Sequence, residues 1–185
     1  EYMIKLTYGD VSDSTYIEVE SDPRIEISLQ ALRETQQLEM DMQDLGARLK
    51  EQTDRMLRAQ EIVEMNEQLA ESDERSKEDL EDVYTATEEI KEKMEEIMNG
   101  IFGTPDDRQG ITRNPEVTVL NRLYAVNRYL GNDADGPGSR EENLLEQAEE
   151  AVNQAVLDIQ TFFRAEWPGY QSTIEAAELS PFKDL

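Results

Sequence analysis

The side chains that could carry chemistry in this chain are mainly carboxylates. Of 185 residues, 43 are Asp or Glu and 18 are Lys or Arg, while His and Cys are both absent. The missing types exclude disulfides, thiol nucleophiles, Ser-His-Asp triads and metal sites built on imidazole or thiolate. A di-iron carboxylate centre is excluded too, because it needs Glu-x-x-His pairs facing the interior of a helix bundle.

Adjacent acidic residues recur and invite comparison with the two carboxylates of a glycosidase. The pairs are Glu88-Glu89, Glu95-Glu96, Glu141-Glu142 and Glu149-Glu150. Neighbouring residues of a helix point about 100° apart, so the two members of a pair do not converge on one substrate. We therefore predict no catalytic residue and no cofactor-binding residue in this chain.

One turn partly resembles a calcium loop. In the twelve residues from Gly131 to Glu142, Asp133 and Asp135 occupy the third and fifth places, Gly136 the sixth and Glu142 the twelfth. The first place, which should hold a carboxylate, is Gly131, and a proline follows the required glycine. An ordinary Asp/Gly turn is the better account, so we predict no metal. Asp133, Asp135 and Glu142 remain the calcium alternative.

Several aromatic residues could form a platform for carbohydrate or peptide: Tyr8, Tyr16, Tyr124, Tyr129, Phe162, Phe163 and Trp167. Aromatic residues on strands and near helix ends more often pack in the core or at junctions. We favour that second interpretation.

The elements that would position these residues begin with a β-hairpin. Apolar and aromatic residues fill every second position from Tyr2 to Tyr8, turn-forming residues follow, and an extended pattern resumes from Tyr16 to Glu20. We expect a loop too long for the tightest turn types. A lone hairpin is marginal in water. Residues 1–24 are therefore expected to be strands of a larger sheet whose other strands precede them.

From about Ser28 the apolar period changes from 2 to 3.5, which predicts a long helix with one buried seam. The seam is Leu38, Met42, Leu45, Leu49, Gln52, Met56, Ala59 and Val63. Roughly 40 residues would measure about 60 Å at 1.5 Å per residue, longer than any partner helix. Part of this helix is expected to project, or to rest against another domain.

Three further apolar stripes predict three more helices. Ser76 with Asp79 is a capping-box pair that starts the second helix, and Asn99-Gly100 stops it. Asn114-Pro115 is a start signal for the third helix.

Ser139 with Glu142 is the capping-box pair that starts the fourth helix, which we expect to end near Trp167 and to be followed by a polar tail. The predicted fold class is mainly α. Residues 25–185 should form an antiparallel four-helix bundle with a long first helix, and the hairpin should precede it.

The net charge of −25 limits the classes of partner that this chain is expected to bind. A field of this sign repels phosphate backbones and anionic head groups, so we predict neither nucleic-acid nor membrane binding. No apolar run approaches the roughly 20 residues that span a bilayer. The partner should be a protein or upstream domains of the same polypeptide, and the oligomeric state is left open.

A family resemblance bears on the role. Residues 1–9, residues 16–20 and Asp22-Pro23-Arg24 resemble the closing strands of the immunoglobulin-like module in bacterial sortilin-like proteins. These proteins carry Asp-box (BNR) β-propeller repeats upstream and are often labelled glycosyl hydrolases. Residues 120–124 are also similar to their C-terminal helical region. The resemblance implies an exported, multidomain protein, located outside the cell or in its envelope, in which residues 1–24 are the terminal strands of an Ig-like β-sandwich.

Together these observations favour a non-catalytic C-terminal structural or interaction module. The alternative is an accessory part of a glycoside hydrolase whose active site lies in an upstream propeller. Any hydrolase activity would reside in that propeller and not in this chain.

Overall fold

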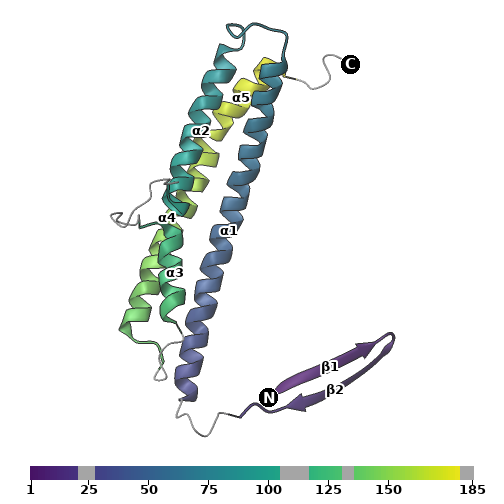
Figure 1. Cartoon of the computed structure of the whole chain (residues 1–185), viewed down its shortest axis with the longest axis vertical. Coiled ribbons are helices and arrows are strands. Elements are labelled where there is room, and N and C mark those ends of the chain that lie inside the picture. The colour runs from purple at the N-terminus through teal and green to yellow at the C-terminus, as the bar shows by residue number, and fades with distance from the viewer. Residues whose placement is uncertain (21–27, 105–116, 131–135, 180–185) are drawn as a thin grey trace, which may run out of the picture.

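The computed structural model describes residues 1–20, 28–104, 117–130 and 136–179. These residues form one hairpin and five helices (Figure 1). The hairpin is β1 (Tyr2–Tyr8) and β2 (Val11–Ile17), and the helices are α1 (Leu29–Ser72), α2 (Glu81–Phe102), α3 (Val119–Tyr129), α4 (Ser139–Ala165) and α5 (Trp167–Ala177). The predicted fold class is confirmed: a mainly α bundle with a long first helix, preceded by a β-hairpin.

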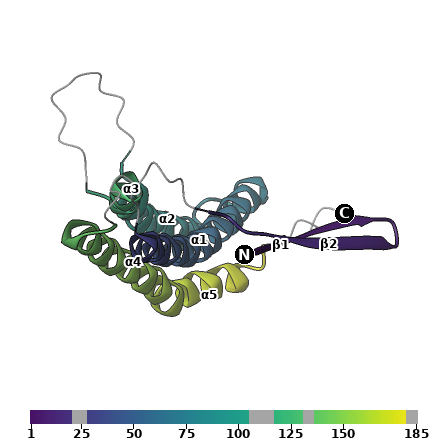
Figure 2. The same ribbon diagram turned by 90° about the horizontal axis from the view of Figure 1, so that it is seen from below.

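The helices stand in three columns, because α3 continues the line of α2 and α5 continues the line of α4 (Figures 1 and 2). The column of α2 and α3 runs antiparallel to α1, and Lys91 on α2 pairs with Glu67 on α1. The column of α4 and α5 returns in the direction of α1. Four predicted stripes therefore pack as three columns, and a fifth helix completes the third.

Helix α1 is longer than either stacked column, and none of its residues from 32 to 44 is buried. It has 44 residues, whereas α2 and α3 have 22 and 11 and α4 and α5 have 27 and 11. Two helices placed end to end therefore cover most of α1 but not all of it, and whether the remainder projects or rests against another domain stays a prediction. Ala31 near its start and Ala70 near its end are both buried.

The core follows the predicted seam of α1. Its buried members are Leu45, Leu49, Met56, Ala59 and Val63, and Leu38, Met42 and Gln52 are half-buried. Against them pack Ile90 and Met94 of α2 and Val152, Ile159 and Phe162 of α4. Burial of these apolar side chains is the main term that stabilises the bundle, at about 25 cal/mol per Å².

The predicted capping pair of the second helix is formed, but the helix itself starts and ends later than predicted. The Ser76 backbone N–H donates to Asp79 Oδ2, and the Asp79 N–H donates to Ser76 Oγ, each over 3.2 Å. Regular helix begins two residues after Asp79 and runs to Phe102, past the predicted stop at Asn99-Gly100. Ile101 is buried, so the core holds this last turn, and Gly103 ends it with φ +93°.

The third helix starts later than predicted. Thr118 is its N-cap, and Thr118 Oγ1 accepts a hydrogen bond from the Asn121 N–H over 3.1 Å. Val117 and Thr118 precede the helix, so the start does not follow the Asn114-Pro115 signal directly. That signal lies outside the described residues.

The fourth helix is capped one residue earlier than predicted. Gly138 is the N-cap, and its N–H donates to Glu141 Oε2 over 2.9 Å. The capping carboxylate is therefore Glu141, which is buried, and not Glu142. Ser139 is the first helical residue instead of the cap.

The fifth helix replaces the predicted polar tail. Pro168 lies in its first turn, a position that proline favours because the N–H it lacks would have no partner there. Tyr170 is buried in the core. At the far end of α5, Arg75 Nη1 donates to the Ala177 carbonyl over 2.9 Å, which ties α5 to the connection between α1 and α2. Arg75 Nε and Nη2 donate hydrogen bonds to the Asp73 carboxylate, and these bonds raise the pKa of Arg75 above its usual value.

The hairpin has a tighter loop than predicted. Tyr8 pairs with Val11, so only Gly9 and Asp10 separate the strands. Gly9 has φ +57° and Asp10 does not have a positive φ, which is the pattern of a type II′ turn with glycine at its first central position. Polar residues at 12–14, which suggested a longer loop, are part of β2 instead.

Candidate interaction surfaces

The hairpin has one mostly apolar side, and that side is exposed. Directly paired residues of an antiparallel ladder point to the same side, and successive residues of a strand alternate between sides. One side therefore carries Tyr2, Ile4, Leu6, Tyr8, Val11 and Ile17, together with Asp13 and Thr15. The opposite side carries Met3, Lys5, Thr7, Ser12, Ser14 and Tyr16.

All residues of both strands are exposed, including the six large apolar residues of the first side. Their exposed fractions range from 42% for Ile17 to 87% for Tyr8. A contiguous apolar patch of this kind is unusual on an isolated monomer and marks an interaction surface. The apolar alternation of β1 is thus present, but no other layer of the described residues covers its apolar side.

The acidic pairs show no convergent chemistry. Glu141 is occupied as the cap of α4, whereas the other members of the four predicted pairs are exposed on helix surfaces. Among the described residues, no group of three or more Asp or Glu side chains is placed to hold a metal ion.

The calcium alternative is only partly within the described structure. Asp133 and Asp135 lie outside the described residues, and Glu142 is exposed in the first turn of α4. Gly136 has φ +91° and packs against Ala31, so this connection closes over the start of α1. The predicted absence of a metal and its calcium alternative both stay predictions, which calorimetric titration with calcium tests.

The aromatic residues divide into a packed cluster and an exposed set. Phe162, Phe163, Trp167 and Tyr170 contact one another at the junction of α4 and α5, with ring centroids 5.2–6.3 Å apart for the neighbouring pairs. This is the junction packing expected from the sequence. Tyr124 and the hairpin tyrosines are exposed instead.

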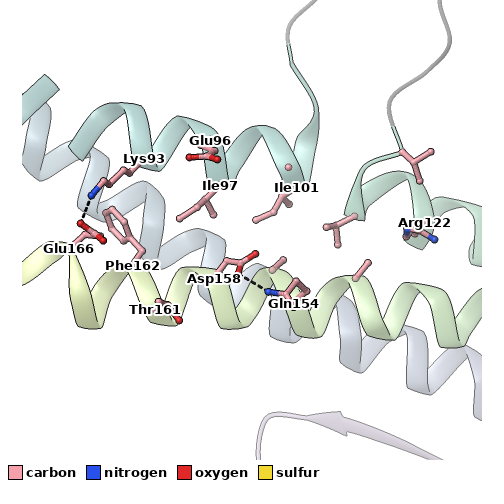
Figure 3. A pocket seen from close by; sticks show the side chains of 15 residues that line it. Lys93, Glu96, Ile97, Ile101, Arg122, Gln154, Asp158, Thr161, Phe162 and Glu166 are labelled. Atoms are coloured by element: carbon pink, nitrogen blue, oxygen red, sulfur yellow. Dashed lines mark hydrogen bonds and ion pairs between the residues drawn. The ribbon is translucent and has the colours of Figure 1, made fainter. Parts of the chain in front are cut away.

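A first groove of about 700 Å³ lies between α2 and α4, beside the start of α3 (Figure 3). Its walls include Ile97 and Ile101 of α2 and the buried Phe162 of α4. Three charged groups at its edges are already engaged: Lys93 pairs with Glu166, and Asp158 Oδ1 accepts a hydrogen bond from Gln154 Nε2 (Figure 3). The lining of this groove is typical of a contact between packed helices.

A second groove, of about 810 Å³, follows α3 where it lies beside α4. Its lining contains arginine, asparagine, glutamine and tyrosine but no Asp or Glu. Arg122 Nη1 donates to Gln147 Oε1 of α4 over 3.1 Å, and the Arg140 guanidinium carbon lies 3.7 Å from the centre of the Tyr129 ring. The apolar and acidic patterns of the sequence did not predict this surface. Its signal is the absence of any acid from residue 117 to 132 in a chain that is otherwise rich in them.

None of the helices in the described part of the chain combines the length and apolarity needed to cross a bilayer. Comparison with protein-family models, with curated proteins and with solved structures finds no match to this chain.

Proposed function

We propose that this chain is a non-catalytic structural and interaction module of a larger exported protein. In this proposal the three-column bundle is a stiff support, and the hairpin docks its apolar face on another β-layer. That layer belongs to the same polypeptide or to a protein partner. The family resemblance of residues 1–24 supports an Ig-like sandwich as the layer and a location outside the cell or in its envelope.

The observation that carries the proposal is the exposed apolar side of the hairpin. A fully buried Val, Leu, Ile or Phe contributes about 1.5–3 kcal/mol relative to an exposed one. Six large apolar residues on a strand pair of seven residues each can therefore contribute several kcal/mol on docking. An isolated two-stranded hairpin lacks this term and is marginal in water. The far side of the hairpin, with Lys5, Thr7, Ser12 and Ser14, is suited to face solvent.

The experiment compares this chain alone with the whole gene product that contains it. Amide hydrogen exchange of β1 and β2 should be fast in the isolated chain and slower by at least about tenfold in the whole product, because docking protects the strands. Equal exchange rates in the two samples would contradict the proposal.

A matched pair of variants tests which side docks. Ile4→Asp places a charge on the apolar side, opposite Thr15, and should abolish the protection of the strands in the whole product. Thr7→Asp places the same charge on the polar side, opposite Ser12, and should leave the protection unchanged. The proposal fails if both variants behave alike.

A further inference from the structure

The helix α3 has an electrostatic character opposite to that of the rest of the protein. It contains Arg122 and Arg128 and no acidic residue, whereas each of the other four described helices contains acids and the whole chain carries −25. At physiological salt, exposed charges are screened beyond about 8 Å. Acids that lie farther than this from the groove therefore act only weakly on a ligand lying on α3.

The groove beside α3 is elongated. It runs from Val117 to Tyr129, and the eleven residues of α3 rise about 16 Å. This length matches about five residues of an extended peptide at roughly 3.3 Å each. A narrow segment of that size fits within the acid-free groove, whereas a nucleic-acid duplex or a membrane would also meet the acidic faces of the neighbouring helices.

The side chains along the groove combine hydrogen-bond donors with apolar contacts. Arg122 is oriented by its hydrogen bond to Gln147, and its planar guanidinium has further N–H groups suited to a carboxylate. Tyr124 and Val117 are both more than half exposed and supply apolar surface next to it. The required partner alternates carboxylates with apolar or aromatic side chains.

We propose that the groove formed by α3 and α4 binds a short acidic peptide segment of a partner protein, in which Glu or Asp residues alternate with apolar ones. Arg122 binds a carboxylate of this segment, and Tyr124 packs against an apolar side chain. Charge complementarity between the acid-free groove and the acidic segment selects the partner. This interaction is separate from the docking of the hairpin, and either can fail without the other.

The test uses fluorescence anisotropy with a labelled peptide, Glu-Leu-Glu-Ser-Glu-Leu-Glu-Ser, and the same peptide with Gln in place of Glu. The acidic peptide should bind the full chain at low salt, weaken when NaCl is raised to 0.5 M, and bind at least about tenfold more tightly than the neutral peptide. Absence of binding at millimolar peptide, or equal binding of both peptides, would overturn the proposal.

Three variants locate the site. Arg122→Gln should weaken binding of the acidic peptide by about tenfold, since it removes a charge-assisted hydrogen bond. Tyr124→Ser should also weaken it without changing the charge. Arg58→Gln, an exposed arginine on α1, removes the same charge elsewhere and should leave affinity within about twofold. Unchanged melting temperatures would show that the variants are folded. Equal losses of peptide affinity from Arg58→Gln and Arg122→Gln would overturn the assignment of the site to the groove beside α3.

Two competing occupants are measured in the same assay. Inorganic phosphate or vesicles with anionic lipid that displace the peptide completely at sub-millimolar concentration would indicate a general anion site and overturn the peptide proposal. Self-association in sedimentation that Arg122→Gln abolishes would identify a second copy as the occupant, also against the proposal. Binding that survives phosphate and occurs to a monomeric chain supports it.

Discussion

Asn66 Nδ2 on α1 donates a hydrogen bond to Tyr170 Oη on α5 over 3.3 Å in the buried interior of the bundle. A second contact, from Arg48 Nη2 to Asn153 Oδ1 on α4 over 2.6 Å, has nearly the same separation in sequence. The constant offset means that α4 and α5 follow α1 in parallel, although a proline and a glycine lie within the first residues of α5. Asn66 and Tyr170 therefore fix the position of the fifth helix.

The first prediction concerns this hydrogen bond. Tyr170→Phe removes the acceptor and leaves the buried amide of Asn66 without its partner, which costs about 1–3 kcal/mol. Denaturation with urea should show this loss in the free energy of unfolding with no change in slope. The double variant Asn66→Leu with Tyr170→Phe should recover a large part of it, because two apolar groups then face each other. Equal stability of the single variant and the parent would contradict the assigned role.

Much of the fold could be predicted from the sequence because the apolar period of a helix is set by its geometry. All the strongly apolar residues of the α1 seam from Leu45 to Val63 are buried, and the capping box of Ser76 and Asp79 is formed. The fifth helix was missed because Pro168 suggested a stop, although proline also starts helices. Stacking of α2 on α3 could not be predicted, since it depends on which helix ends meet across the core.

The surfaces were less predictable than the fold. The alternation from Tyr2 to Tyr8 predicted the apolar side of the hairpin, but periodicity cannot tell whether another layer covers it. The groove along α3 required that residues of two helices be brought together, and only the local absence of acids hinted at it. Periodicity reports which face of an element is apolar, and not what lies against that face.

The second prediction concerns two glycines. A Cβ at position 136 would lie 2.8 Å from the Cβ and 3.0 Å from the Cα of Ala31, and Gly136 has φ +91°. Gly136→Ala should therefore destabilise the bundle by about 1–3 kcal/mol. Gly46→Ala on α1 meets nothing within 4 Å and should stabilise it by about 0.5–1 kcal/mol through helix propensity. Thermal unfolding of both variants checks that their stabilities change in opposite directions. An unchanged stability of Gly136→Ala would show that residue 136 does not pack against α1.

The third prediction separates core from surface on α4. Ile159 is fully buried, whereas Leu157, two residues earlier, is half exposed. Ile159→Ala should cost about 2–5 kcal/mol because it removes buried methyl groups and leaves a cavity. Leu157→Ala should change stability by less than about 1 kcal/mol. Similar losses from the two variants, measured by chemical denaturation, would mean that α4 is rotated relative to the described core.

The fourth prediction concerns the independence of the bundle from the hairpin. Every residue of β1 and β2 is exposed. Removal of residues 1–20 should therefore leave the melting temperature of the helices within about 2 °C, because no core contact is lost. Circular dichroism at 222 nm follows the helices during heating. A large drop in melting temperature would indicate that the hairpin packs on the bundle in solution.

The last prediction concerns salt. With 43 acidic and 18 basic side chains, folding brings like charges closer together, and the resulting repulsion opposes the compact state. Raising NaCl from 0.01 M to 0.1 M shortens the screening length from about 30 Å to about 10 Å. The melting temperature should therefore rise. Ion pairs such as Lys50 with Asp54 weaken in parallel, but exposed pairs contribute only about 0–1 kcal/mol each.

A charge-neutralising variant distinguishes total charge from other effects of salt. Glu149→Gln with Glu150→Gln removes two exposed acids from α4, so it should raise the melting temperature at low salt and flatten its dependence on NaCl. This result would show that individual surface ion pairs affect the melting temperature less than the total net charge does. A melting temperature that falls as NaCl rises would show the opposite. Local ion pairs would then affect stability more than the net repulsion does.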